Sequence, residues 1–196
     1  MFENGFPKYI LKQADKILEL INENAAGVEN SAGVFLPPFR DNYNSEYELY
    51  VLSNGEKIRF PYRIYLNDSS PVYDRLTDIT EKLIYDCVFT RSNDGHIREK
   101  HALSILNSDI PEFCFPYLIR LSSEYSVEII KAIYDGLKKR NNDDIAAFCQ
   151  NNRIILARAY KRMESYWNVY YRKDCPEFEK YVGYSLFSNV FCVNNT

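Results

Sequence analysis

The sequence predicts a mainly α-helical domain in which helical hairpins stack on one another and a small β-hairpin packs on the N-terminal half. Residues 81–106 are answered by a similar segment at 112–137, and each segment reads as helix, short turn, helix. A repeat of about thirty residues is typical of stacked hairpins, because one hairpin cannot bury its apolar face alone. An Asn-Gly dipeptide at 54–55 predicts the β-hairpin, and a long apolar stripe from Asp143 predicts a further helix.

The length of 196 residues suits one domain. We expect a single domain over 1–196, divided into an N-terminal helix within 1–26, a β-hairpin at 47–65 and a helical body at 72–192. This organisation assigns most of the chain to one helical core.

Charge and composition exclude several classes of protein. The net charge is -3, with both signs interspersed, so the chain as a whole does not attract nucleic acid or anionic membranes. No apolar run approaches the ~20 residues that span a bilayer, and we expect a cytoplasmic protein without membrane contact. The five cysteines lie far apart and include no C-x-x-C pair, so we expect buried reduced thiols, no zinc site and no cofactor.

The first helix is predicted from an apolar face that recurs at helical spacing. Pro7 suits an early helical position, and the helix should end before Gly27. The apolar face consists of Ile10, Ala14, Ile17, Leu18 and Ile21. The segment 34–39 contains two consecutive prolines, which exclude helix and favour an extended path.

The β-hairpin prediction rests on the turn at Asn54-Gly55, the preferred dipeptide of a two-residue type I′ turn. Pairing outward from this turn sets three residue pairs on the apolar face: Val51 with Ile58, Leu49 with Phe60, and Tyr47 with Tyr62. The opposite face then holds Leu52 with Lys57, Tyr50 with Arg59, and Glu48 with Pro61. Because a lone hairpin is marginal in water, it should pack on helices or gain a strand from the segment near Phe35.

The helical body begins after Pro71. Asp74 or Asp78 is expected to cap its first helix, which should stop at the turn Arg91–Gly95. Further helices are predicted at 96–106, from Pro111 or Pro116, and at 126–138. From Asp143 an apolar stripe continues for about 27 residues, or ~40 Å of uninterrupted helix. Cys175-Pro176 should end it, and a last helix should include Phe178 to Phe191.

The run DGHIREKHALSIL at 94–106 resembles the second helix of a HEAT-type repeat, with an acidic turn before an aliphatic-Arg pair. The segment FPYLIRL at 115–121, followed by VEI at 127–129, looks like the first helix and turn of a second unit. The resemblance covers residues 81–137. It implies stacked helical hairpins and a non-catalytic scaffold that binds proteins, and some small HEAT-like proteins bind DNA.

Catalytic chemistry has little support in the sequence. None of the nucleotide-binding, hydrolase or metalloprotease motifs is present. His96 and His101 diverge by about 140° on one helix and cannot share a metal from it. His101 is expected at the edge of the core, and the alternative is a base paired with Cys87 in a small enzyme. That alternative requires the two side chains in contact in an open cleft.

The candidate binding surface is the polar back of the predicted long helix. Segment 153–173 has six Lys or Arg residues against one Glu. The candidate binding residues are Arg158, Lys161, Arg162, Arg172, Tyr160 and Tyr171. They predict a surface for a protein partner, a nucleic-acid site of interleaved cations and aromatic rings, or a solvated face paired with Glu46, Glu48 and Glu56.

These patterns lead to three hypotheses about function. The leading hypothesis is a cytoplasmic, non-catalytic interaction module that binds an unidentified protein. The alternative is nucleic-acid binding through the basic stripe, by which we mean Arg158, Lys161, Arg162 and Arg172. The second alternative is the Cys87/His101 enzyme. The sequence identifies neither the partner nor the oligomeric state.

Overall fold

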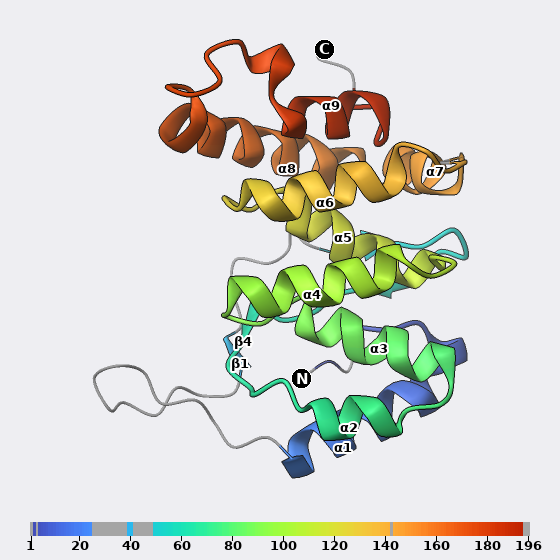
Figure 1. Ribbon diagram of the computed structural model, residues 1–196. Coiled ribbons are helices and arrows are strands. Elements are labelled where there is room, and N and C mark those ends of the chain that lie inside the picture. Colours follow the sequence, from blue (N-terminus) through green and yellow to red (C-terminus); the bar gives the residue numbers. More distant parts are fainter. Residues whose placement is uncertain (1, 3, 25–38, 41–48, 142, 194–196) are drawn as a thin grey trace.

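The computed structural model describes residues 2, 4–24, 39–40, 49–141 and 143–193, and this part of the chain is mainly α-helical (Figure 1). Its nine α-helices are α1 Leu11–Asn24, α2 Ser70–Arg75, α3 Ile79–Phe89, α4 Gly95–Leu106, α5 Phe115–Ser122, α6 Val127–Leu137, α7 Asp143–Asn151, α8 Arg153–Tyr166 and α9 Val182–Asn189. Short turns of 3-10 helix are η1 Lys8–Ile10, η3 Glu112–Cys114 and η5 Phe178–Lys180.

The helices lie one above another in a stack that runs from α1 and α2 at one end to α9 at the other (Figure 1). Along one column α1 packs on α3, α3 on α4, α4 on α6, and α6 on α9. A second column is formed where α5 packs on both α6 and α8. The buried apolar side chains of these helices form one continuous core cluster.

The first helix forms as predicted, with η1 leading directly into α1. Ile10, Ala14, Ile17 and Ile21 are buried, and Leu18 packs against the core from a partly exposed position. The helix ends at Asn24, and the predicted stop at Gly27 lies outside the described residues.

The β-hairpin is present, but its predicted register is wrong by one residue on the first strand. Strands β2 Tyr50–Val51 and β3 Lys57–Ile58 pair antiparallel with Tyr50 opposite Ile58. The loop between Leu52 and Glu56 has three residues, and Gly55 has φ 81°. A type I turn followed by a left-handed glycine produces this loop, whereas a type I′ turn would need both central residues at positive φ.

The longer loop reverses the faces of the first strand. The buried residues of the hairpin are Tyr50, Leu52, Ile58 and Phe60, while Leu49 and Val51 are partly exposed. The side chains of β2 alternate, so a change of one residue moves the whole set to the other face. The predicted pair of Tyr47 with Tyr62 is not described, because Tyr47 lies outside the described residues.

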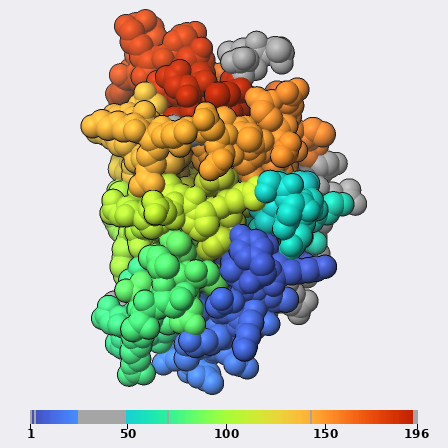
Figure 2. Space-filling view, turned by 90° about the vertical axis from the view of Figure 1, so that its right-hand side faces the viewer, coloured from blue at the N-terminus to red at the C-terminus, as the bar shows by residue number. Residues whose placement is uncertain are grey.

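Helices hold the hairpin in place, as the marginal stability of an isolated hairpin requires. The hairpin lies between the N-terminal helix and α7 on the face shown in Figure 2. Its turn is bound by the Glu112 carboxylate, which accepts hydrogen bonds from the Ser53 backbone N–H at 2.6 Å and hydroxyl at 2.7 Å. The additional strand predicted near Phe35 lies outside the described residues. A separate pair forms between β1 Phe39–Arg40 and β4 Arg63–Ile64.

The hairpins of the helical body form near the predicted boundaries. The Asp78 carboxylate accepts a hydrogen bond from the Glu81 backbone N–H at 3.0 Å and therefore caps α3. Asp94 caps α4 in the same way, with the His96 N–H at 2.8 Å. Pro116 lies in the first turn of α5, where its missing N–H leaves no bond unmade.

The predicted long helix is wrong, because the chain breaks at Asn152 into α7 and α8. The Asn152 side chain accepts a hydrogen bond from the Val51 backbone N–H at 2.8 Å and donates to the Val51 carbonyl at 2.9 Å. It also donates to the Phe148 carbonyl at 2.9 Å. The Asn152 side chain thus pairs with the backbone of Val51 as a neighbouring strand would. It does so from the break between α7 and α8.

Candidate interaction surface

The surface begins where α8 ends in a π-helical turn, η4 Trp167–Tyr171. A π-turn inserts one residue into a helix and is frequent at functional sites. The turn is held from inside by the Trp167 indole N–H, which donates to the Cys175 carbonyl at 2.9 Å. Outside it, Val169 is 66% exposed and Tyr170 is 59% exposed. Large apolar side chains therefore project into solvent from a turn that is itself anchored.

Three tyrosine rings gather at this turn and come from two hairpins. Tyr125, from the turn between α5 and α6, is 52% exposed. Its ring centre lies 6.3 Å from that of Tyr166 and 6.4 Å from that of Tyr170. The Tyr166 and Tyr170 rings are 6.1 Å apart. We call Tyr125, Tyr166, Val169 and Tyr170 the tyrosine surface.

Tyr171 fastens the two sides of the tyrosine surface together. Its hydroxyl donates to the Tyr125 carbonyl at 2.6 Å and accepts from the Val127 backbone N–H at 3.3 Å. Its ring stacks on Tyr181 with centres 5.6 Å apart. The exposed rings are therefore carried by a backbone that Tyr171 connects to the start of α6.

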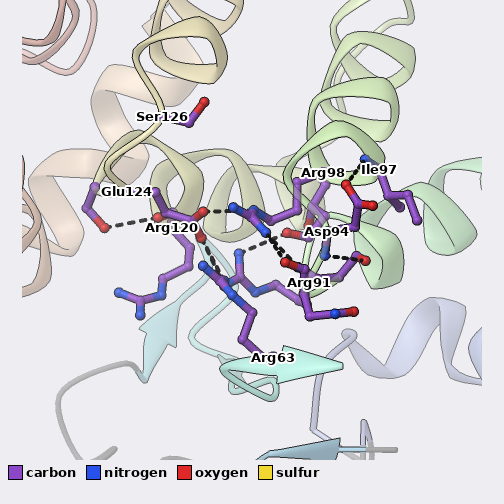
Figure 3. A network of polar contacts seen from close by, with 12 residues as sticks. Arg63, Arg91, Asp94, Ile97, Arg98, Arg120, Glu124 and Ser126 are labelled. Carbon is purple, nitrogen blue, oxygen red and sulfur yellow. Dashed lines mark hydrogen bonds and ion pairs between the residues drawn. The ribbon is translucent and has the colours of Figure 1, made fainter. Parts of the chain in front are cut away.

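Glu124, the residue before Tyr125, is the centre of a cluster of arginines in which Glu124, Arg91 and Arg98 are buried (Figure 3). The Glu124 carboxylate is 2.8 Å from the Arg63 Nη1 atom, 3.3 Å from the Arg91 Nη2 atom and 2.8 Å from the Arg98 Nε atom. We call these four residues the arginine cluster. It connects β4, the turn before α4, α4 itself and the turn before α6.

The backbone is part of the same cluster. The Arg98 Nη1 atom donates to the carbonyls of Ser92 at 2.9 Å and Asn93 at 3.0 Å. The Arg91 Nη2 atom donates to the Tyr62 carbonyl at 2.8 Å. These bonds fix the turn before α4 relative to α4 itself and to the segment that leads into β4, on the same side of the stack as the end of α8 (Figure 1).

Electrostatics keep Glu124 ionised. Burial raises the pKa of this carboxyl group, but the charges of Arg91, Arg63 and Arg98 outweigh burial and hold its pKa below the ordinary value. An unpaired carboxylate at this depth would instead take up a proton. The ring of Tyr62 lies between this cluster and Arg120, with the Arg63 and Arg120 guanidinium carbons 4.8 Å and 4.7 Å from its centre.

A hollow of about 300 Å³ opens beside Tyr125 and Tyr171. Arg98 contributes to its lining together with Gly95, His96 and Glu99 of α4 and Ser126 and Glu128 at the start of α6. The hollow is large enough for one side chain of a partner. Exposed rings beside a hollow on a rigid backbone are the arrangement in which interfaces concentrate their binding energy.

The structure distributes the predicted binding residues over different environments. Lys161 and Arg172 are exposed, and Arg172 donates to the Asn168 side chain at 3.0 Å. Arg158 and Arg162 are partly exposed. Tyr160 is buried between Phe178 and Phe187, so it belongs to the core and offers no binding surface. Glu46 and Glu48, the expected ion-pair partners of the stripe, lie outside the described residues, and Glu56 caps the Lys8 N–H instead.

The geometry of Cys87 and His101 does not meet the condition set for an enzyme. Both side chains are buried. The Cys87 thiol faces the Cys114 sulfur at 3.6 Å, and burial raises the pKa of Cys87 and disfavours the thiolate. The two ring nitrogens of His101 face Asp86 at 2.6 Å and Asp68 at 3.2 Å. The predicted buried thiols are found at Cys87, Cys114 and Cys149, whereas Cys175 is partly exposed and Cys192 exposed.

Sequence reasoning missed the tyrosine surface because its members come from separate segments. Tyr166 and Tyr170 are one turn apart, and at this spacing both continue the apolar stripe that predicts the long helix. The π-turn rotates the residues after Tyr166 away from that stripe, and no residue type marks such a turn in advance. Glu124 and Glu128 are one turn apart in the sequence, a spacing that is typical of a solvated face and gives no sign of a buried ion cluster.

Comparisons with known proteins give no relative. No family model, curated protein or solved structure matches the chain. Within the described residues, no helix is both long and apolar enough to cross a bilayer, and no cluster of three potential metal ligands occurs.

Proposed function

We propose that this protein is a non-catalytic, HEAT-like interaction module that binds another protein through the tyrosine surface. The observation that carries the proposal is the gathering of three tyrosine rings and Val169 from two hairpins beside a hollow. Tyrosine and arginine are the residues on which protein interfaces most often depend, since a rigid ring contributes a large contact area at little cost in entropy.

The foundation of this surface supports the proposal. The arginine cluster and the Tyr171 hydroxyl connect the turns that carry the exposed rings, so the rings are ordered before a partner arrives. Preorganised side chains lose less conformational entropy on binding. A surface of this kind binds a partner through the fixed arrangement of its rings and not through a reactive group.

The proposal places the module in the cytoplasm. In a reducing compartment the buried, neighbouring thiols of Cys87 and Cys114 would stay unbonded.

The test is a quantitative affinity enrichment with the full chain as bait. The double variant Tyr125→Ala/Tyr170→Ala removes two exposed rings, and Tyr9→Ala, whose side chain is 60% exposed on η1, removes an equally exposed ring elsewhere. A true partner should bind wild type and Tyr9→Ala equally and the double variant at least about tenfold more weakly. The purified pair should then reproduce this order by calorimetry. Equal binding to all three baits would refute the proposal.

A second candidate function, single-stranded nucleic-acid binding, is favoured by one observation. Arg158, Arg162, Tyr166 and Tyr170 are spaced four residues apart along α8 and η4, so two cations are followed by two rings there. Fluorescence anisotropy with a labelled single-stranded oligonucleotide at low salt tests it. Affinity should fall steeply with salt and in Arg158→Glu/Lys161→Glu. Absence of binding at low salt rules it out.

A further inference from the structure

A second buried polar network surrounds His101, between α3 and α4. Asp86 lies 2.6 Å from the His101 Nδ1 atom, and Asp68 lies 3.2 Å from its Nε2 atom. Asp86 belongs to α3, His101 to α4, and Asp68 to the segment that leads into α2. The ring therefore connects a chain segment to a hairpin.

The positions of the two carboxylates favour a doubly protonated ring. An ionised carboxylate only accepts hydrogen bonds, and a neutral imidazole has a single N–H. The hydrogen bond between the Nδ1 atom and Asp86 uses one N–H, and the Asp68 carboxylate lies close enough to the buried Nε2 atom to stabilise a positive charge on the ring. Burial lowers the pKa of His101, but the carboxylates of Asp68 and Asp86 outweigh burial and raise it above the ordinary value.

The surrounding groups complete the charge balance. Lys100 on α4 is 2.5 Å from Asp68, so two carboxylates face two cations when His101 is protonated. Among the described residues, three hydroxyl groups also contact the two carboxylates as neutral donors. The Ser104 hydroxyl donates to Asp86 at 2.7 Å and the Tyr73 hydroxyl of α2 contacts it at 3.3 Å, while the Tyr85 hydroxyl of α3 donates to Asp68 at 3.0 Å.

We propose that His101 is a proton-operated latch, which as an imidazolium fastens segment 68–75 to the α3/α4 hairpin and releases it when the proton leaves. Loss of the proton leaves one carboxylate facing a ring lone pair and the network with a net charge of minus one. Asp68 is the partner that can move, because its segment is short and α2 has only six residues. Helices of that length are unstable without tertiary contacts.

The sign of the pH effect follows from linkage. A histidine whose pKa is raised by folding stabilises the closed state fully below its unfolded pKa and loses this contribution as pH rises through its folded pKa. Opening of segment 68–75 should therefore increase with pH, by at most about tenfold per pH unit for one proton. The rest of the stack lacks this ring and should not follow.

Two measurements on the wild-type chain test the latch. Nitrogen-15 NMR of the imidazole rings at about pH 6 should show N–H signals from both nitrogens of His101, with His96→Gln used to assign the second histidine. Hydrogen exchange followed by mass spectrometry, corrected for intrinsic rates, should show opening of 68–75 rising between about pH 6 and 9, with α6 as the internal reference. His101→Gln should make opening of 68–75 independent of pH in this range.

A single N–H on His101 at the lower pH would overturn the proposal. A uniform rise in opening across 68–75 and α6 would overturn it as well, since it would indicate global destabilisation. Both outcomes can be read from wild type, so the test does not depend on the variant folding.

Discussion

The arginine cluster and the His101 network both connect separate elements of the chain through buried charges, but the cations that they use differ in whether they titrate. The arginine cluster joins two hairpins through cations that stay charged at every accessible pH. The His101 network joins a segment to one hairpin through a cation that can lose its charge. The comparison teaches that burial alone does not make a polar joint permanent, because the permanence comes from the titration of its donors.

The position of each charge in its hairpin sharpens the comparison. Arg91 is the second residue after α3, and Glu124 is the second residue after α5, so equivalent turns of the two hairpins carry opposite charges. The turns thus attract each other across the stack. Asp86 and His101 instead pair within one hairpin, between its two helices.

Removing the charge of Glu124 should have the largest effect. Glu124→Gln keeps the shape but leaves the guanidinium groups of Arg63, Arg91 and Arg98 without their carboxylate. Breaking a buried ion pair in this way costs about 3–5 kcal/mol of the free energy of unfolding. Urea denaturation followed by circular dichroism measures the loss. Glu128→Gln, an exposed carboxylate four residues later, is the control and should change stability by less than about 0.5 kcal/mol.

Acid should weaken both networks and so lower the free energy of unfolding. In the arginine cluster the group that takes up the proton is Glu124. The folded pKa values of Glu124 and Asp68 are lowered, in each case by nearby cations that outweigh burial. Their stabilisation is present above the unfolded pKa values and is lost as pH falls through the folded ones. Urea midpoints should therefore fall progressively as the pH drops below about 5. The pH dependence should be shallower in Glu124→Gln, and an equal slope would contradict this assignment.

Variants of Asn152 test how much stability an uncharged side chain contributes, for comparison with the two charged networks. Asn152→Ala removes both hydrogen bonds to Val51 and leaves that backbone N–H and carbonyl without their partner. The expected cost is about 1–3 kcal/mol. Asn152→Asp is the informative comparison, since it keeps an acceptor for the Val51 N–H but presents no donor to the carbonyl. Urea denaturation should rank Asn152→Asp no more stable than wild type, and an unchanged Asn152→Ala would contradict a structural role.

Much of the helical order could be predicted from the sequence, because apolar periodicity and caps such as Asp78 and Asp94 are local signals. The register of the β-hairpin could not, since Asn54-Gly55 fits two loop lengths and packing of Tyr50 and Leu52 selects one. The break at Asn152 depends on a hairpin one hundred residues away in the chain. A periodic pattern carries no trace of such a partner.

The candidate site was harder to predict than the fold, for the same reason. The basic stripe was visible in the sequence because its charges follow one another along a helix. The tyrosine surface depends on a π-turn and on the approach of Tyr125 from another hairpin, neither of which has a local signature. The sequence places Tyr160 on the binding surface, and this prediction is wrong because Phe178 of η5 and Phe187 of α9 cover its ring only in the folded chain.

The smallest effect on stability should come from two helix caps, Asp78 at the start of α3 and Asp94 at the start of α4. Asp78→Ala and Asp94→Ala each remove a side-chain acceptor at the start of a helix and should cost about 1 kcal/mol. Asp94 is expected to cost more, because it accepts from His96 and lies in the turn whose carbonyls bind Arg98. A looser turn there should loosen the arginine cluster too. Thermal denaturation of both variants and of Asp94→Ala/Glu124→Gln tests this coupling: strictly additive losses would show that cap and cluster act independently.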